Sequence, residues 1–167
     1  MNSAEIFKRF PGLWNFTRIA KSKTPNLPSG TIEGQASFTE AGTDALHYQE
    51  TGRFSPDVGD ALEVRMEYFY YLNTQENRIE KYFAKDGQKT GLFYALKFSQ
   101  GGSPSLEATG DHLCIADTYK ASYQFPSPND DDFKSFRLTY TVNGPKKDYT
   151  TETIFELKSS IKPKNSG

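Results

Sequence analysis

The sequence is poor in the features that mark secreted, membrane and nucleic-acid-binding proteins. A single cysteine among 167 residues excludes an internal disulfide. No apolar run is long enough for a transmembrane helix, and the mean hydropathy is -0.70. The 20 basic and 21 acidic residues give a net charge of -1, without the basic surplus of a general binder of nucleic acid or anionic membranes. The first residues lack a basic region followed by an apolar stretch, so we expect a cytoplasmic protein without a secretory signal.

Aromatic residues are what the chain has in abundance. They make up 14% of the sequence, with 13 phenylalanines and 10 tyrosines. Disordered chains are poor in aromatics, so this chain is expected to fold. Its length fits one domain, large enough to enclose a cavity. We therefore predict a single domain over residues 1–160, and a flexible tail over residues 161–167, where lysine, proline, asparagine and serine predominate.

The hydrophobic pattern predicts strands along almost the whole chain. Only the first residues look helical, with Ser3 as the N-cap and Pro11-Gly12 as the stop. Beyond them the apolar residues alternate with polar ones, and Asp86-Gly87 is a hairpin signal. In 112–125 the alternation changes parity, which predicts a long strand interrupted by a bulge. The expected strands are 13–19, 31–38, 46–54, 62–72, 78–84, 91–98, 112–125, 137–142 and 147–158.

This order of elements indicates the fold class. About nine short strands with regular turns and no interposed helix predict an all-β, antiparallel up-and-down barrel with a short N-terminal helix. Closed barrels of about eight strands can hold one small ligand.

Five segments spread along the chain resemble a known family. The opening Gly12-Leu13-Trp14 is similar to the Gly-X-Trp start of the calycins, the lipocalin-like barrels. With the other four segments, the chain resembles the calycin-like domain-of-unknown-function family 6314. The resemblance implies a lipocalin-like barrel with a pocket, and no particular reaction. The segments are Gly12-Leu13-Trp14 with Arg18; Tyr48 to Gly52; Asp86-Gly87; His112 to Tyr119 with Tyr123; and Gly144 to Tyr149.

Glu50 is the sharpest candidate for a functional residue. It shares the apolar face of its strand with Tyr48, and buried carboxylates are rare unless they are paired or hydrogen-bonded. Arg18 and Arg65 are the expected partners. Such a pair inside a barrel can be structural, or it can form the polar end of a ligand site, and the sequence leaves both open.

The segment 111–125 contains a second group of candidates. His112 and Cys114 lie two apart on a strand and share a face, so they can be metal ligands or a Cys-His pair, or else wall residues. A parity change separates them from Asp117. Structural or ligand-lining roles are the favoured interpretation. Tyrosine hydroxyls can orient a ligand. The tyrosines expected to line the cavity are Tyr68, Tyr119 and Tyr123.

Three functional hypotheses follow. The first is a barrel that binds a small molecule in a partly polar cavity. The second is an enzyme on the same barrel, with Glu50 or Asp117 as a base and a tyrosine as an acid. The third is haem binding through His112 or, less favourably, through His47 on the polar face of its strand. We expect a small-molecule ligand, but no nucleic-acid or membrane partner. The residues specify neither a cofactor nor an oligomeric state.

Overall fold

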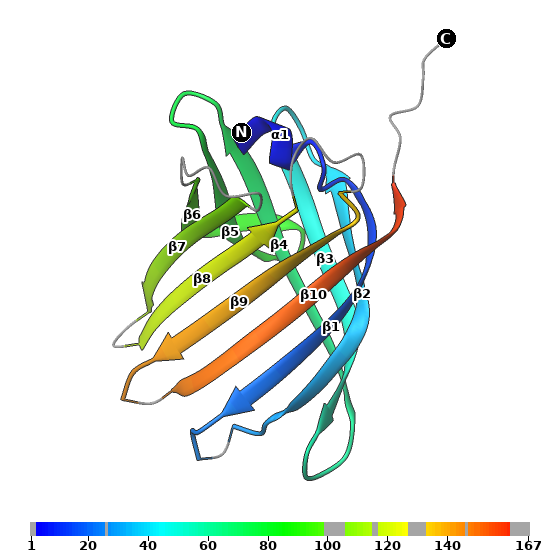
Figure 1. The fold of residues 1–167 in the computed structure, drawn as a ribbon, viewed down its shortest axis with the longest axis vertical. Coiled ribbons are helices and arrows are strands. Elements are labelled where there is room, and N and C mark those ends of the chain that lie inside the picture. The colour runs from blue at the N-terminus through cyan, green and yellow to red at the C-terminus, as the bar shows by residue number, and fades with distance from the viewer. Residues whose placement is uncertain are drawn as a thin grey trace.

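The computed structural model describes residues 3–25, 27–98, 106–114, 117–126, 133–145 and 147–160, without the side chains of 106–109, 113 and 114. One short helix, α1 (Ser3–Phe7), precedes ten strands (Figure 1). This helix is far too short to cross a membrane, and the described part of the chain contains no helix that could. The strands are β1 (Gly12–Ser22), β2 (Gly30–Glu40), β3 (Ala45–Pro56), β4 (Leu62–Asn73), β5 (Arg78–Lys85), β6 (Gln88–Phe98), β7 (Leu106–Cys114), β8 (Asp117–Phe125), β9 (Ser135–Asn143) and β10 (Asp148–Ser160).

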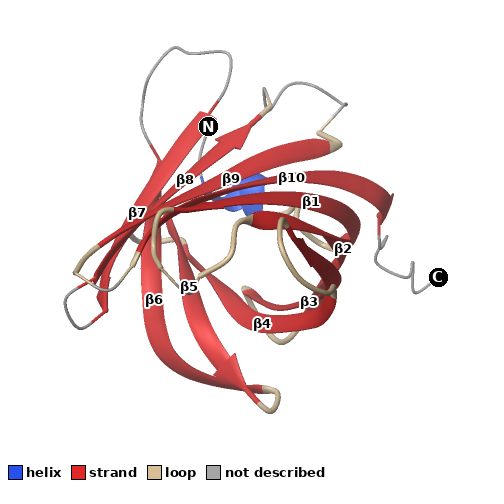
Figure 2. Cartoon of the chain, turned by 90° about the horizontal axis from the view of Figure 1, so that it is seen from below, coloured by secondary structure: helices blue, strands red, loops and turns tan. Residues whose placement is uncertain are grey.

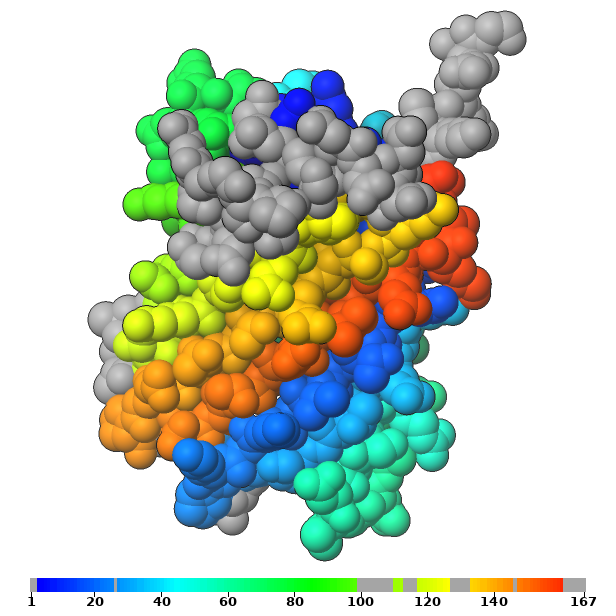
Figure 3. All heavy atoms as spheres, viewed as in Figure 1, coloured from blue at the N-terminus to red at the C-terminus, as the bar shows by residue number. Residues whose placement is uncertain are grey.

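The strands form a closed antiparallel barrel in which neighbours in sequence are neighbours in space. Closure comes from β1, which pairs with β2 on one side and with β10 on the other. Figure 2 shows the resulting ring of strands from below, and Figure 3 shows β8, β9, β10 and β1 packed side by side on one face. The prediction of an all-β up-and-down barrel with a short N-terminal helix is confirmed.

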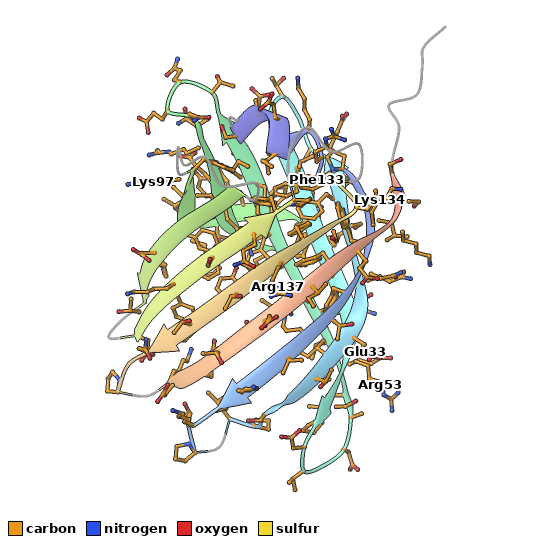
Figure 4. All side chains as sticks on the ribbon, in the orientation of Figure 1. Glu33, Arg53, Lys97, Phe133, Lys134 and Arg137 are labelled. Carbon is orange, nitrogen blue, oxygen red and sulfur yellow. The ribbon has the colours of Figure 1, made fainter. Side chains whose placement is uncertain are left out.

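Alternation along each strand decides which side chains enter the barrel. In β3, Tyr48 and Glu50 are buried, whereas the intervening Gln49 is exposed. Glu33 of β2 and Arg53 of β3 lie opposite each other in the register, and both point outward (Figure 4). A one-residue slip would exchange the two faces, so the aromatic content of the inner face strongly specifies this register.

The end of the barrel next to α1 is filled by aromatic side chains. Trp14 is fully buried, and its Nε1 donates a hydrogen bond to the carbonyl oxygen of Phe10 at 2.9 Å. The ring of Phe136 meets Trp14 edge-on, with centroids 5.0 Å apart. Phe10 also stacks on Phe38 at 4.9 Å. These contacts close this end, so any cavity must lie further along the barrel.

The structure corrects the prediction of one long strand over 112–125. The chain instead reverses between β7 and β8, and Cys114 pairs with Asp117 across the resulting hairpin. The parity change therefore marks a turn and not a bulge, and it raises the number of strands to ten. The turn was not recognised from the parity change, because this segment contains neither glycine nor proline.

The barrel wall is weakly paired at two places. Strand β4 pairs with β5 only between Tyr68 and Asn73, so its first half has β3 as its single described neighbour. Strand β6 pairs with β7 through only two described residue pairs. In this half of β4, which has no described partner on its other side, Met66 is 46% exposed although it lines the interior cavity. The interior is therefore accessible from the side of β4 away from α1.

Candidate functional site

A cavity of about 310 Å³ lies inside the barrel, between the aromatic plug and the end away from α1. Its wall is aromatic with a few charged and hydroxyl groups, which is the usual character of a small-molecule site. Every strand contributes except β7, whose side chains are only partly described. The lining residues are Arg18, Ile32, Phe38, Tyr48, Glu50, Val64, Met66, Tyr68, Tyr70, Lys81, Phe93, Tyr119, Tyr123, Phe136, Leu138, Tyr140, Tyr149, Thr151 and Phe155.

Arg18 and Glu50 form a two-pronged ion pair in the cavity wall. Arg18 Nη1 donates to Glu50 Oε2 at 2.9 Å, and Nη2 donates to Oε1 at 3.0 Å. Tyr48 donates a third hydrogen bond to Oε1 at 2.9 Å. A third Arg18 donor, Nε–H, donates to Thr153 Oγ1 at 2.7 Å. Glu50 is only 4% exposed, and both of its carboxylate oxygens accept hydrogen bonds from protein groups.

Electrostatics keep the Arg18 guanidinium protonated. Burial by itself lowers the pKa of the Arg18 guanidinium, but the charge and hydrogen bonds of Glu50 outweigh burial and keep that pKa above its ordinary value. Burial, and then the charge of Glu50, raise the pKa of Tyr48 well above its ordinary value, so the phenol stays a hydrogen-bond donor. The pair is therefore a fixed, internally neutralised polar group.

Lys81 is a second buried basic side chain in the wall. It is 2% exposed, and its Nζ donates to the hydroxyl of Tyr140 at 2.8 Å. That is the one hydrogen bond from Nζ among the described residues, and no ion pair joins Nζ to a carboxylate among them. Aromatic rings surround Nζ, with centroid distances of 4.1 Å to Tyr68, 5.2 Å to Tyr70 and 5.4 Å to Tyr140.

This environment changes the acidity of the lysine. Burial lowers the pKa of Lys81 to about 7, with the charge of Glu50 acting in the opposite direction and that of Arg18 adding to the effect. The amine is consequently close to half neutral at pH 7, although an exposed lysine is almost fully protonated there.

Four tyrosine hydroxyls extend from Lys81 into the barrel. The hydroxyl of Tyr140 lies 2.6 Å from that of Tyr94, which lies 2.6 Å from that of Tyr123. Tyr123 in turn reaches Tyr70 at 3.1 Å. Each phenol has one proton to donate. The direction of the hydrogen bonds along the four hydroxyls therefore depends on whether Lys81 donates to Tyr140 or accepts from it. Burial raises the pKa of all four phenols, which keeps them protonated.

Polar groups also surround the end of the cavity away from α1. Tyr119 accepts a hydrogen bond from Lys147 Nζ at 3.0 Å. The ring of His112 packs against Phe93 at 5.3 Å and Phe83 at 5.7 Å. Thr151 belongs to the cavity lining, and its buried Oγ1 has no hydrogen-bond partner among the described residues.

Six of the ten residues that the sequence nominates for the site line this cavity. The structure brings together Arg18, Tyr48, Glu50, Tyr68, Tyr119 and Tyr123. The expected Arg18–Glu50 pairing is present.

The other four nominated residues are placed elsewhere. Arg65 is a correction: it is exposed between the inward Val64 and Met66, in an outer groove of about 710 Å³, and Glu50 pairs with Arg18 instead. His112 lies in the aromatic cluster described above, outside the cavity lining. Asp117 is buried against Gly144, and its Oδ1 has no hydrogen-bond partner in the described chain. The side chain of Cys114 lies outside the described part.

The two histidines of the haem hypothesis, His47 and His112, both lie outside the cavity lining. Within the described residues, no three His, Cys, Asp or Glu side chains are grouped to hold a metal ion. His47 lies on the outer face, where it stacks on Phe69 at 4.6 Å and hydrogen-bonds Glu67 at 2.9 Å. Its assignment to the polar face of its strand was therefore correct.

Sequence reasoning missed Lys81, Tyr94 and Tyr140. A signal for Lys81 is present, because it shares the apolar face of its strand with Ile79 and Phe83. Glu50 shares a face with Tyr48 in the same way. Tyr94 was obscured by irregular pairing of β5 with β6, which places both Phe93 and Tyr94 in the interior. Tyr140 could be identified only from its contact with Lys81.

Comparison with known proteins places this barrel in a family. The S-type phycobiliprotein lyase CPES from Guillardia theta matches with a TM-score of 0.65 at 10% identity, covering 96% of this chain and 95% of that one. Rv2717c from M. tuberculosis matches with a TM-score of 0.64 at 14% identity, covering 94% and 98%. At these identities the likeness concerns the fold alone. No curated protein sequence matches. Residues 10–157 match the family of unknown function DUF6314, and the chain belongs to that family.

Proposed function

We propose that this barrel binds one small, largely aromatic or conjugated molecule with a polar group, in the cavity of about 310 Å³. The observation that carries the proposal is unused hydrogen-bonding capacity in an otherwise apolar wall. Lys81 Nζ makes one hydrogen bond within the described chain, and buried Thr151 Oγ1 makes none. Buried polar groups without partners are costly, and a ligand that bonded to them would remove that cost.

The shape and lining of the cavity favour a flat ligand. Tyr68 and Phe93 lie 6.0 Å apart at 32°, and Phe93 and Tyr140 are stacked at 6.0 Å. Aromatic faces of this kind pack well against planar ligands. The volume lies at the lower end of the range for ligand sites, so the ligand is small. The similarity to a lyase and to Rv2717c supports the barrel but does not identify a ligand.

Glu50 is a poor candidate for the general base of an enzyme. Three hydrogen bonds from Arg18 and Tyr48 occupy its carboxylate. A base must reach the proton that it abstracts, and this carboxylate would first have to leave its partners. The ion pair is better suited to shaping the cavity than to acid–base chemistry.

The test uses native mass spectrometry of protein purified from its source. Val64 lines the cavity near its accessible side, so Val64→Trp should fill that region and remove any co-purifying small molecule. Glu63→Trp is the matched control, because Glu63 is the exposed neighbour on the same strand. A bound species retained equally by both variants would contradict binding in this cavity.

A further inference from the structure

Lys81 combines three properties that a purely structural lysine does not need. Its amine is buried, it lines the cavity where a ligand would lie, and no carboxylate pairs with it within the described chain. A fully protonated ammonium has three N–H donors, whereas Nζ makes one hydrogen bond among the described residues, to Tyr140. The arrangement therefore suits a neutral amine better than a permanent cation.

We propose that Lys81 is a nucleophile that forms a reversible imine with an aldehyde or ketone in the cavity, with the Tyr140 hydroxyl as its proton shuttle. The proposal rests on the proposed function, since it identifies a carbonyl compound as the class of ligand. It assigns the chemistry to one atom, Lys81 Nζ, and to the hydroxyl 2.8 Å away.

The surroundings of Nζ favour the reactive form of the amine. The rings of Tyr48, Tyr68 and Tyr70 face it from β3 and β4, at centroid distances of 5.9, 4.1 and 5.2 Å. Phe93 and Tyr94 face it from β6, and Tyr140 faces it from β9. The charged groups that act on it are Glu50 and Arg18, which pair with each other.

Desolvation dominates the balance of these effects. It lowers the pKa of Lys81 to about 7, so a substantial share of the amine has a free lone pair at neutral pH. Desolvated lysines in apolar pockets are the ones that act as Schiff-base nucleophiles. The ring faces stabilise what remains of the charged form, which helps to keep Nζ in place.

The reaction balances without an oxidant or a reductant. The Nζ lone pair forms a bond to the carbonyl carbon, while the carbonyl π pair moves to its oxygen. That oxygen takes a proton from Tyr140, which regains one from the amine, and a neutral carbinolamine results. The carbinolamine hydroxyl then leaves as water with a proton from Tyr140, the nitrogen lone pair forms the C=N bond, and Tyr140 takes back the last N–H proton.

Tyr140 is placed to give and receive these protons without ionising. Burial raises its pKa, so a tyrosinate would be unstable in the cavity. The hydroxyl also lies 2.6 Å from that of Tyr94, and either of the two can be the donor. The direction of this hydrogen bond can therefore reverse after each proton transfer. This makes Tyr140 a proton shuttle and not an independent acid.

The experiment traps the imine with a small aromatic probe. The protein is incubated with benzaldehyde and sodium cyanoborohydride at pH 7, and the benzylated residues are located by peptide mapping. Lys89 is the internal reference, because it is exposed at the start of β6. The neutral fraction of Lys81 exceeds that of an exposed lysine by about a thousandfold at pH 7. We expect benzylation of Lys81 at least tenfold faster than that of Lys89.

Two variants and a pH series sharpen the result. Lys81→Met should lose the fast benzylation and keep the slow benzylation of Lys89. Lys89→Arg should keep the fast benzylation of Lys81. Tyr140→Phe should slow labelling of Lys81 about tenfold or more. The rate for Lys81 should level off above pH 7, while that for Lys89 continues to rise. Labelling of Lys81 no faster than that of Lys89, or none at all, would overturn the proposal.

Benzyl alcohol separates this proposal from the proposed function. It has the same ring but cannot form an imine, so its binding, followed by NMR chemical shifts, reports the cavity alone. If benzyl alcohol binds and Val64→Trp abolishes that binding, the cavity is a ligand site whatever happens to Lys81. If Val64→Trp changes neither this binding nor the co-purifying species, the proposed function itself fails.

Discussion

Arg18 and Glu50 meet through two parallel hydrogen bonds of 2.9 and 3.0 Å inside the barrel, although they come from strands that are not neighbours in the sheet. Strand β2 lies between β1 and β3, and its Gly34 pairs with Phe16 on one side and Gly52 on the other. A Cβ on Gly34 would collide with the backbone of Thr51. The absence of a side chain there permits the close approach of strands beside the ion pair.

Glu50→Gln is expected to lower the free energy of unfolding by about 3–5 kcal/mol, because it leaves the buried Arg18 charge without compensation. Denaturant unfolding monitored by circular dichroism measures the change. Glu152→Gln is the matched control, since Glu152 pairs with Arg137 at 3.3 Å with both side chains about half exposed. It should cost less than about 1 kcal/mol. Equal effects of the two changes would contradict the buried ion pair.

Trp14→Ala should destabilise the protein by about 3–5 kcal/mol, because it opens a cavity in the aromatic plug and removes the hydrogen bond to Phe10. Asn15→Ala, at the exposed neighbouring position, should change the unfolding midpoint little. The midpoint in urea measures both. A Trp14→Ala protein that unfolds at the same midpoint as the parent would show that the plug is not part of the core.

Lys81→Met should stabilise the protein most below pH 7. Lys81 has a pKa of about 7 in the folded protein and an ordinary value of 10.5 when unfolded. Between these values the unfolded chain binds more protons, so the stability of the parent rises with pH; below about 7 and above about 10.5 the lysine contributes no pH dependence. The advantage of Lys81→Met should therefore shrink from pH 7 upward, by at most about 1.4 kcal/mol per pH unit.

Urea unfolding of the Lys81→Met protein and the parent between pH 6 and 9.5 measures this difference, with Lys89→Met as the exposed control. That range stays below the pKa near 10 at which tyrosines ionise in the unfolded chain. A gap in stability that stays constant across the range would contradict the lowered pKa of Lys81.

Gly144→Ala is expected to destabilise the turn between β9 and β10 by about 1–3 kcal/mol, because the new methyl group would overlap the carboxylate of Asp117. The double variant Gly144→Ala/Asp117→Ala should recover only part of the loss, since it removes the carboxylate but leaves the backbone Cα of residue 117, which lies 2.8 Å from the new Cβ position. Thermal melts of the two proteins provide the measurement. A full-sized loss in the double variant would show that the backbone of the turn, and not Asp117, is responsible.

The architecture could be predicted from the residues alone, because period-two alternation and turn residues are local signals. The inward placement of Tyr48 and Glu50 followed from alternation alone, and so did the outward placement of His47. Trp14, the tryptophan of the Gly-X-Trp segment, is fully buried. The same local rule failed at the β7–β8 reversal, where Cys114 faces Asp117 without any glycine or proline to mark the turn.

The composition of the site was decided by the tertiary structure. Alternation shows that a side chain points inward, but not which side chains of other strands it meets. In the closed barrel Arg18, and not Arg65, lies beside Glu50 and pairs with it. Closure also places Lys81 of β5 against Tyr140 of β9, 59 residues apart in sequence. The lowered pKa of Lys81 depends on burial by several strands at once, and that burial exists only in the closed barrel.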